Sequence, residues 1–449
     1  MPFRRRALWA LVILCCMALL VAPAVWNGFP LLQFDTGGYI APWYDHHLHI
    51  NRSVPYGLLL VAGRSPDFWP VPIMQSALTL LVLALTLRAH GLGGRPFLLL
   101  GLTAALCLVT TLPWLTGILL TDIFSGLAVL ALYLLLLRAE ALSGAERIGL
   151  FALLALSAAT HSGTLAMLIL LVGAAGAVWL IDRRCIPVAR LGNAVLALAL
   201  GAAMVLVADI LVTGQPAWTP GGPALSFGRM LQDGIVTRYL DDHCAGETLA
   251  LCPYRAELKR DADDFFWGGG VFNRLGRFGG LNDEMRHIAF AAALDYPGPQ
   301  LKSLLSESAK QLTMVDTGAG VVNWIWNTYA MIERDVPAAV PAMKAARQQR
   351  TGLSFTAINR LQVPVAWLCM ALLPLLALYA RRRKGFADIA ELNATVALAV
   401  LANAAVFGVF ATAHNRYGAR LVWLAALAAL LTLARLIAQR APRLATGKA

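Results

Sequence analysis

Long apolar runs separated by short polar segments dominate the chain. Each run is about 17 to 22 residues long, the length that a helix needs to cross about 30 Å of hydrocarbon. The pattern predicts an all-α fold, a polytopic transmembrane helical bundle of about ten spans. The expected spans are residues 8–25, 71–89, 96–112, 118–137, 148–161, 164–181, 193–213, 363–380, 392–411 and 419–437.

The apolar stretch 148–181 requires a break. Its 34 residues would form one helix of about 51 Å, which is too long for a single crossing. Arg147 and Arg183 flank the stretch, and one crossing would put these two basic residues on opposite sides of the membrane. We therefore expect two short helices that turn at Thr160–Gly163.

Composition agrees with a protein that is solvated by lipid. Hydrophobic residues make up 59% of the chain and charged residues 14%, with a mean hydropathy of +0.65, which is more apolar than a soluble core requires. The net charge of +12 comes largely from basic residues at the ends of the apolar runs. That placement is typical of membrane topology, so we expect a lipid bilayer and no nucleic acid among the partners.

Basic residues also orient the spans. Arg4, Arg5 and Arg6 place the N-terminus in the cytoplasm, and every later basic loop falls on the same side under this count. Pro23–Trp26 is a poor cleavage site, so the first apolar run is expected to remain as a span. Both termini are expected in the cytoplasm. The Ala/Leu/Arg-rich composition favours the inner (plasma) membrane of a bacterium.

Three regions follow from this order. Residues 1–213 are expected to form an N-terminal transmembrane region of about seven spans, with a first outer loop at 26–70. Residues 214–362 are expected to form an extracytoplasmic, mostly helical domain. Residues 363–449 are expected to form a C-terminal transmembrane region of about three spans and a cytoplasmic tail.

Two of the seven cysteines lie in the long polar loop, whereas the other five lie in or beside apolar runs. Cys244 and Cys252 are candidates for a local disulfide if that loop is outside the cytoplasm. Zinc ligation is the alternative, but no second Cys or His pair stands at finger spacing.

Two carboxylates lie near the expected outer interface. Asp35 follows the first span by about ten residues, where it suits a general base or a turn cap. Asp122 lies near the outer end of the fourth span. An ionisable residue at that depth favours a functional role, and a favourable position in the helix dipole is the alternative.

Three cationic or titratable residues fall on the same side. His161 closes the fifth span, and His414 and Arg416 lie in the short turn between the last two spans. The planar guanidinium of Arg416 suits phosphate oxygens, and His414 could act as a second cation or acid. A helix cap or a headgroup contact remains the alternative for Arg416.

The first outer loop also contains a histidine-rich stretch with His46, His47 and His49. These residues are candidate ligands for a divalent metal, but their spacing lacks the i, i+4 geometry of a helical site. A solvated interfacial loop with phosphate contacts is the other interpretation.

These positions resemble motifs of the GT-C superfamily, integral membrane glycosyltransferases that use polyprenyl-phosphate or polyprenyl-diphosphate sugars on the outer or lumenal face. The resemblance rests on an early Asp in Phe34–Tyr39, an Arg-Ser-x-Pro-Tyr-Gly stretch at Arg52–Gly57, Thr121–Asp122, and a His-x-Arg-Tyr motif at His414–Tyr417. It covers mainly the transmembrane part. Unlike many members, the chain has no second carboxylate adjacent to Asp35.

The resemblance implies a hexosyl- or pentosyltransferase of the cell envelope, which moves a sugar from a polyprenyl-phosphate donor to an acceptor on the extracytoplasmic face. Asp35 would be the catalytic base and Asp122 a second acidic residue of the site. Contacts to the substrate are expected from Arg52, Tyr56, His161, His414, Arg416 and Tyr417. The resemblance implies no particular cofactor. It leaves open whether the protein binds a divalent metal.

Two other function classes compete with this prediction. A transporter or flippase of lipid-linked or envelope components fits a ten-helix protein in outline, although transport sites favour polar groups at mid-depth. A membrane polysaccharide polymerase or ligase would share a large late outer loop and arginine contacts to phosphate.

Overall fold

The computed structural model describes residues 3–50, 52–216, 218, 221–323 and 326–445, and these residues form an all-α protein. Seven helices are long and apolar enough to cross a membrane, which makes the chain a multi-pass membrane protein. They are α1 (Phe3–Asn27), α5 (Pro70–Ala89), α10 (Ser162–Ile181), α11 (Val188–Thr213), α21 (Thr356–Arg381), α22 (Ala387–Phe410) and α23 (Asn415–Ala445). The last four residues of the expected cytoplasmic tail lie outside the described part.

The other three expected spans are also helices, but shorter ones. They are α6 (Pro96–Val109), α8 (Asp122–Leu137) and α9 (Gly144–Thr160). Nearly all of α8 is buried among its neighbours, and a short helix is tolerated at membrane depth where protein covers its ends. All ten expected segments are therefore helical, while a count of ten crossings stays a prediction.

The predicted break in 148–181 is present in the structure. Helix α9 ends at Thr160 and α10 begins at Ser162. Between them His161 has an extended backbone (φ −160°), and its Nδ1 accepts a hydrogen bond from the Gly163 N–H group (3.0 Å). This contact caps the N-terminus of α10. The apolar run is therefore divided into two helices at His161.

Short helices fill the segments between the long ones. The 26–70 segment contains α2 (Thr36–Ile40), α3 (Pro42–Asp45) and α4 (Val54–Ala62). Helix α7 (Leu112–Gly117) precedes α8, and the 3-10 turn η1 (Ala139–Ala141) follows it.

The 214–362 segment, expected as one domain, consists of two parts. The first has its own core of buried apolar side chains between residues 224 and 296. It contains α12 (Gly222–Gln232), α13 (Ile235–His243), η2 (Cys252–Glu257), α14 (Ala262–Trp267), α15 (Val271–Arg274) and α16 (Arg277–Asp295). We call this part the small helical domain.

The second part packs against the bundle. Its elements are α17 (Pro297–Thr313), α18 (Trp326–Asp335), η3 (Pro337–Ala339), α19 (Val340–Ala345) and α20 (Arg347–Arg350). Helix α17 lies along α22, where a methyl group on Gly408 would come within 2.6 Å of the Ser308 nitrogen. Ile332 and Met343, from α18 and α19, are buried in the same core as the long helices.

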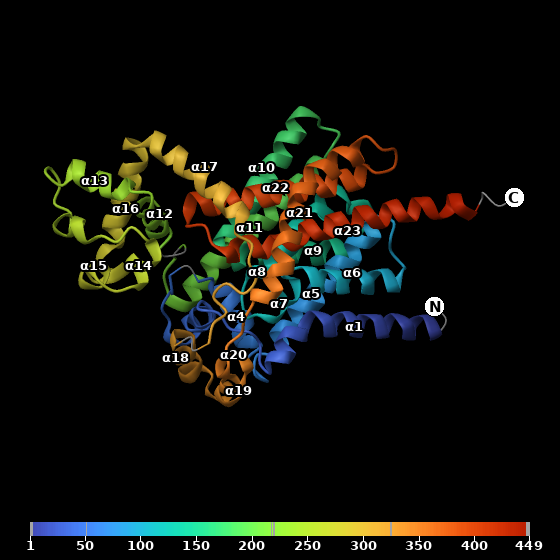
Figure 1. The fold of residues 1–449 in the computed structure, drawn as a ribbon, viewed down its shortest axis with the longest axis horizontal. Coiled ribbons are helices and arrows are strands. Elements are labelled where there is room, and N and C mark those ends of the chain that lie inside the picture. Colours follow the sequence, from blue (N-terminus) through green and yellow to red (C-terminus); the bar gives the residue numbers. More distant parts are fainter. Residues whose placement is uncertain (1–2, 51, 217, 219–220, 324–325, 446–449) are drawn as a thin grey trace.

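The two ends of the molecule differ (Figure 1). The start of α1 and the end of α23 lie together at one end, and the small helical domain lies at the opposite end. Helices α18 to α20 lie beside the 26–70 segment, on the side of the bundle that is away from the termini.

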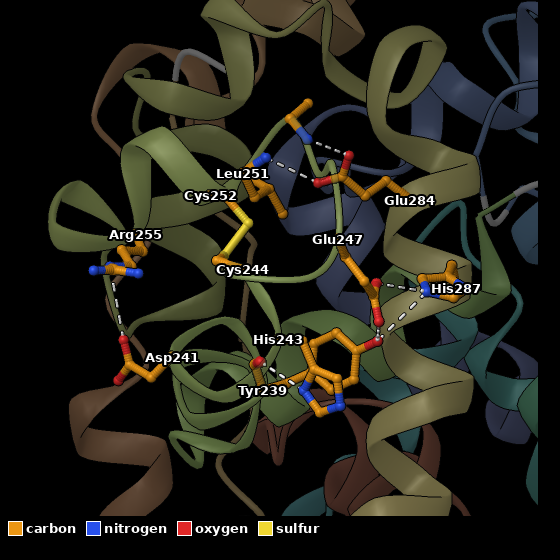
Figure 2. Close-up of a disulfide and its surroundings, with 11 residues drawn as sticks. Tyr239, Asp241, His243, Cys244, Glu247, Leu251, Cys252, Arg255, Glu284 and His287 are labelled. Carbon is orange, nitrogen blue, oxygen red and sulfur yellow. Dashed lines mark hydrogen bonds and ion pairs between the residues drawn. A yellow bond between two sulfur atoms is a disulfide. The ribbon is translucent and has the colours of Figure 1, made fainter.

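A disulfide closes a loop of the small helical domain (Figure 2). Cys244 and Cys252 are bonded, with their Cα atoms 5.6 Å apart. The carboxylate of Glu284 accepts hydrogen bonds from the N–H groups of Ala250 (2.7 Å) and Leu251 (2.9 Å), which fixes the same loop to α16. The loop is thus held covalently and by a charge-assisted contact.

Replacing Cys244 and Cys252 by Ser should destabilise the small helical domain by about 2–4 kcal/mol, because the unfolded loop gains freedom. Limited proteolysis of the purified protein would show earlier cleavage between residues 222 and 296. Cys185→Ser, at an exposed free cysteine, is the control and should leave the pattern unchanged. Alkylation of both loop cysteines without prior reduction would contradict the expectation.

Candidate functional site

The 26–70 segment is joined to the residues before α8 through its backbone. The Leu31 N–H group donates to the Gly117 carbonyl (2.9 Å), and the Leu119 N–H group donates to the Leu31 carbonyl (3.0 Å). The Thr36 hydroxyl donates to the Leu119 carbonyl (3.2 Å). These bonds bring the start of α2 next to the start of α8.

Two side chains from the far end of the 214–362 segment hold the same loop. Buried Gln348 donates to the Leu32 carbonyl (2.7 Å) and accepts from the Leu32 N–H group (3.0 Å). The Thr328 hydroxyl lies within hydrogen-bond distance of the Gln33 carbonyl (3.0 Å). Buried amide and hydroxyl groups of this kind are rarely left without partners, so the loop position is well determined.

A charge network of four side chains forms where these segments meet. Arg52 donates to one carboxylate oxygen of Asp35, and Nη1 of Arg416 donates to the other. Nε of Arg416 donates to Oδ2 of Asp122 (2.7 Å). Arg416 therefore joins the two carboxylates that the sequence singled out, across 381 and 294 positions of the chain.

The two carboxylates have arginine partners and no capping contacts. Asp35 immediately precedes α2, and Thr121 precedes α8, but neither side chain makes a capping hydrogen bond. The carboxylates of Asp35 and Asp122 face arginines instead. The side chain of Asp122 is only 2% exposed, and that of Arg416 is 12% exposed, so both charges are largely removed from solvent.

The environment of Asp35 keeps it ionised. Burial by itself would raise the pKa of this carboxyl, but the guanidinium groups of Arg52 and Arg416 outweigh burial and hold the pKa below its ordinary value. Its ion pairs therefore contribute stability at neutral pH. That contribution is lost only as the pH falls through the lowered value, below the ordinary Asp pKa of about 3.9.

Glycines in α2 allow the side chain of Arg52 to lie against this helix. A methyl group on Gly38 would come within 3.1 Å of Cγ of Arg52, and one on Gly37 within 2.8 Å of the Thr328 Cα atom. The guanidinium of Arg52 also lies over the Tyr39 ring, 5.8 Å from its centroid. The Gly-Gly-Tyr part of the first motif thus shapes the surroundings of Arg52.

A second buried arginine lies one helical turn after Arg416. Arg420 is fully buried and donates to Oδ1 of Asn403 (2.7 and 3.1 Å). Its guanidinium lies 4.5 Å from the centroid of Phe407, which stacks on Tyr417 at 3.8 Å. The sequence analysis missed Arg420, although an arginine inside an apolar span is a signal of function or of a buried partner.

The remaining predicted contacts lie around the network and do not join it. Tyr56 is buried and donates its hydroxyl to Gln75 (3.2 Å). His414 lies 2.7 Å from the Thr412 hydroxyl through Nε2, and its backbone is bonded to Gln311. The ring of His161 lies 6.1 Å from that of Phe407.

The histidine-rich stretch lies apart from the charge network. His49 is 2.9 Å from the Asp45 carboxylate, which also contacts Arg334 at 3.4 Å. The His47 N–H group donates to the other oxygen of Asp45 (3.1 Å). No group of three or more His, Cys, Asp or Glu side chains is placed to hold a metal among the residues that the structure describes.

One pocket is lined by residues of the charge network, and a second pocket shares two lining residues with it. The narrow pocket, of about 40 Å³, is lined by Asp122 and Arg416. The wide pocket, of about 500 Å³, lies at the start of α21. Asp316 and Phe355 line both pockets.

Two residues that line the narrow pocket each have a polar atom without a hydrogen-bond partner among the described residues. Oδ1 of Asp122 and Nη2 of Arg416 are buried and have no hydrogen-bond partner among the described residues. Such atoms are costly to bury without a partner, and they mark places where a polar ligand can bind. A guanidinium N–H group is a suitable donor for a phosphate oxygen.

No protein-family model, curated protein or solved structure matches this chain. The chemistry of the site therefore has to be argued from its own residues.

Replacing Arg416 by Ala should destabilise the protein by about 3–5 kcal/mol, because it leaves the buried carboxylate of Asp122 without a charge partner. Combining it with Asp122→Asn should recover part of the loss. Thermal unfolding in detergent measures both.

Arg286→Ala is the control, since the side chains of Arg286 and its partner Asp283 are 58% and 87% exposed and pair at the surface. If Arg416→Ala unfolds at the same temperature as this control, the charge network does not hold the segments together.

Proposed function

We propose that the protein transfers a sugar from a polyprenyl-phosphate donor to an acceptor hydroxyl on the extracytoplasmic face of a bacterial inner membrane. The observation that carries the proposal is Arg416, which lines a pocket and lies between two carboxylates. It retains a buried N–H group that has no partner among the residues that the structure describes. A phosphate oxygen would satisfy that group.

The electrostatics of the site support binding of an anionic leaving group. The four side chains of the charge network sum to zero charge, and Arg420 adds a buried positive charge nearby. When the bond between sugar and phosphate breaks, negative charge grows on the phosphate. Fixed guanidinium groups in a site with little water stabilise such charge without reorganising.

The position of the charges favours transfer over transport. Asp122 is the first residue of α8 and Arg416 the second of α23, so both lie at helix ends. A transport site is expected near mid-depth, between broken helices. Several apolar residues line the narrow pocket beside Asp122 and Arg416, including Leu31, Leu115 and Leu120.

Two observations support the proposed topology. The charge network lies near the starts of α2, α8 and α23, and the small helical domain lies at the end opposite the termini (Figure 1). The disulfide between Cys244 and Cys252 is typical of an oxidising compartment. With both termini in the cytoplasm, the site and this domain would face outward.

In the proposed reaction the acceptor hydroxyl displaces the phosphate in one step. Arg416 contacts the phosphate, and Asp35 and Asp122 hold its guanidinium from two sides. The resemblance implied Asp35 as the base. A carboxylate already bonded to two arginines, with a lowered pKa, is a poor proton acceptor, so this geometry favours a positioning role for Asp35.

Asp35→Asn should lower transfer by about 10²–10³-fold, because the two arginines lose their shared counter-charge and orientation. Membranes containing wild type or variant are incubated with radiolabelled polyprenyl-phosphate hexoses and pentoses, and label leaving the lipid fraction is counted. Asp45→Asn is the matched control, because Asp45 lies in the same loop but pairs with His49 and Arg334. Failure of wild type to consume any donor would refute the proposed function.

A membrane-impermeant maleimide tests the topology. Exposed Cys185, in the turn between α10 and α11, should react only in inverted vesicles. A cysteine introduced at exposed Asp263, in the small helical domain, should react in intact spheroplasts. Labelling of Cys185 from outside would reverse the proposed orientation.

A further inference from the structure

Asp316 is one of two residues that line both pockets. It is half-buried, lies between α17 and α18, and lines both the wide and the narrow pocket. The narrow pocket also exposes Asp122 and Arg416 on its walls. Asp316 is therefore the carboxylate that the wide pocket shares with the pocket of Asp122 and Arg416.

The backbone around Asp316 is firmly placed. A methyl group on Gly418 would come within 2.0 Å of the Met314 carbonyl, so only glycine lets this segment lie against the start of α23. The Thr317 hydroxyl donates to buried Gln362 (2.6 Å). The Asp316 N–H group donates to the side chain of Asn415 (3.1 Å).

The partners of Asp316 distinguish it from the other two carboxylates of the site. Its only side-chain contact among the described residues is the Asn415 amide, at 3.4 Å. Arg360 lines the wide pocket as well, but it forms no ion pair with Asp316 in the described part of the chain. Asp35 and Asp122 are both ion-paired with Arg416, whereas the Asp316 carboxylate has no arginine partner among the described residues and can accept a proton.

We propose that Asp316 is the general base that takes the proton of the acceptor hydroxyl, in the transfer reaction on which this inference rests. The hydroxyl oxygen bonds to the anomeric carbon, and its proton passes to the Asp316 carboxylate. The bond from the anomeric carbon to the phosphate oxygen breaks, and its electron pair leaves with the phosphate, whose charge Arg416 stabilises.

The pocket sizes fit this division of roles. The wide pocket, about 500 Å³, has room for part of a hydroxyl-bearing acceptor, whereas the narrow one, about 40 Å³, offers room for little more than one small group beside Arg416. Nucleophile and leaving group must approach the anomeric carbon from opposite sides. Asp316 and Arg416 both line the narrow pocket, and Asp316 also lines the wide pocket, where the acceptor is proposed to bind.

Chemical rescue tests the proposal. Asp316→Asn should lower kcat for sugar transfer by about 10²–10⁴-fold with little change in the KM for the donor, because a base acts on the reaction step. Asp316→Ala should be equally impaired, and formate should restore part of its activity by entering through the wide pocket as an external base. Asp35→Ala should not respond to formate, and exposed Asp263→Asn should behave as wild type.

The outcomes separate this inference from the proposed function. If wild type transfers sugar and Asp316→Asn keeps more than about a tenth of the activity, Asp316 is not the base and the proposed function stands. If both Asp316 variants unfold at lower temperature and formate restores nothing, the residue is structural and the inference fails. If wild type consumes no lipid-linked sugar, the proposed function itself fails.

Discussion

Arg416 forms ion pairs with Asp35 and Asp122, and the arrangement around the site depends on these contacts. The three residues come from the segment after the first span, the start of α8 and the start of the last helix. Their charges are largely shielded from solvent, so each requires the others as partners. Removing one would leave a charge in a medium that cannot solvate it.

Ion pairs of this kind seldom add much net stability, because desolvation offsets most of the attraction. An apolar cluster would hold the same segments together at lower cost. Two of the four charged side chains, Asp122 and Arg416, line the narrow pocket, and Arg420 is buried one turn further on; we propose that a ligand binds there. Unpartnered N–H and carboxylate atoms in the same place support this interpretation.

Local pattern predicted much of the fold. Apolar run length located the ten segments that are helical, and flanking arginines located the break at His161. The same local pattern identified Asp35, Asp122 and Arg416 as candidate site residues, because charged residues are rare in apolar segments. Their mutual contact could not be read from the sequence, since it depends on hydrogen bonds between residues roughly 300 to 400 positions apart.

Other features of the site had weaker sequence signals. Asp316 lies in a polar segment where a carboxylate is ordinary, and only the two pockets give it significance. Tyr56 and His414 belong to the motifs, but their polar atoms bond to Gln75 and Thr412. The sequence also does not show that the 214–362 segment consists of two parts. Helices that pack on a bundle and helices with their own core have similar local patterns.

We propose that the phosphate of a lipid-linked donor binds beside Arg416. A structure of the protein in lipid nanodiscs, with a non-transferable polyprenyl phosphonate sugar bound, is the decisive test. We expect a phosphonate oxygen at hydrogen-bond distance, about 2.7–3.2 Å, from the Arg416 guanidinium, with the sugar toward Asp316. A phosphonate bound elsewhere, with the four charged side chains undisturbed, would contradict it.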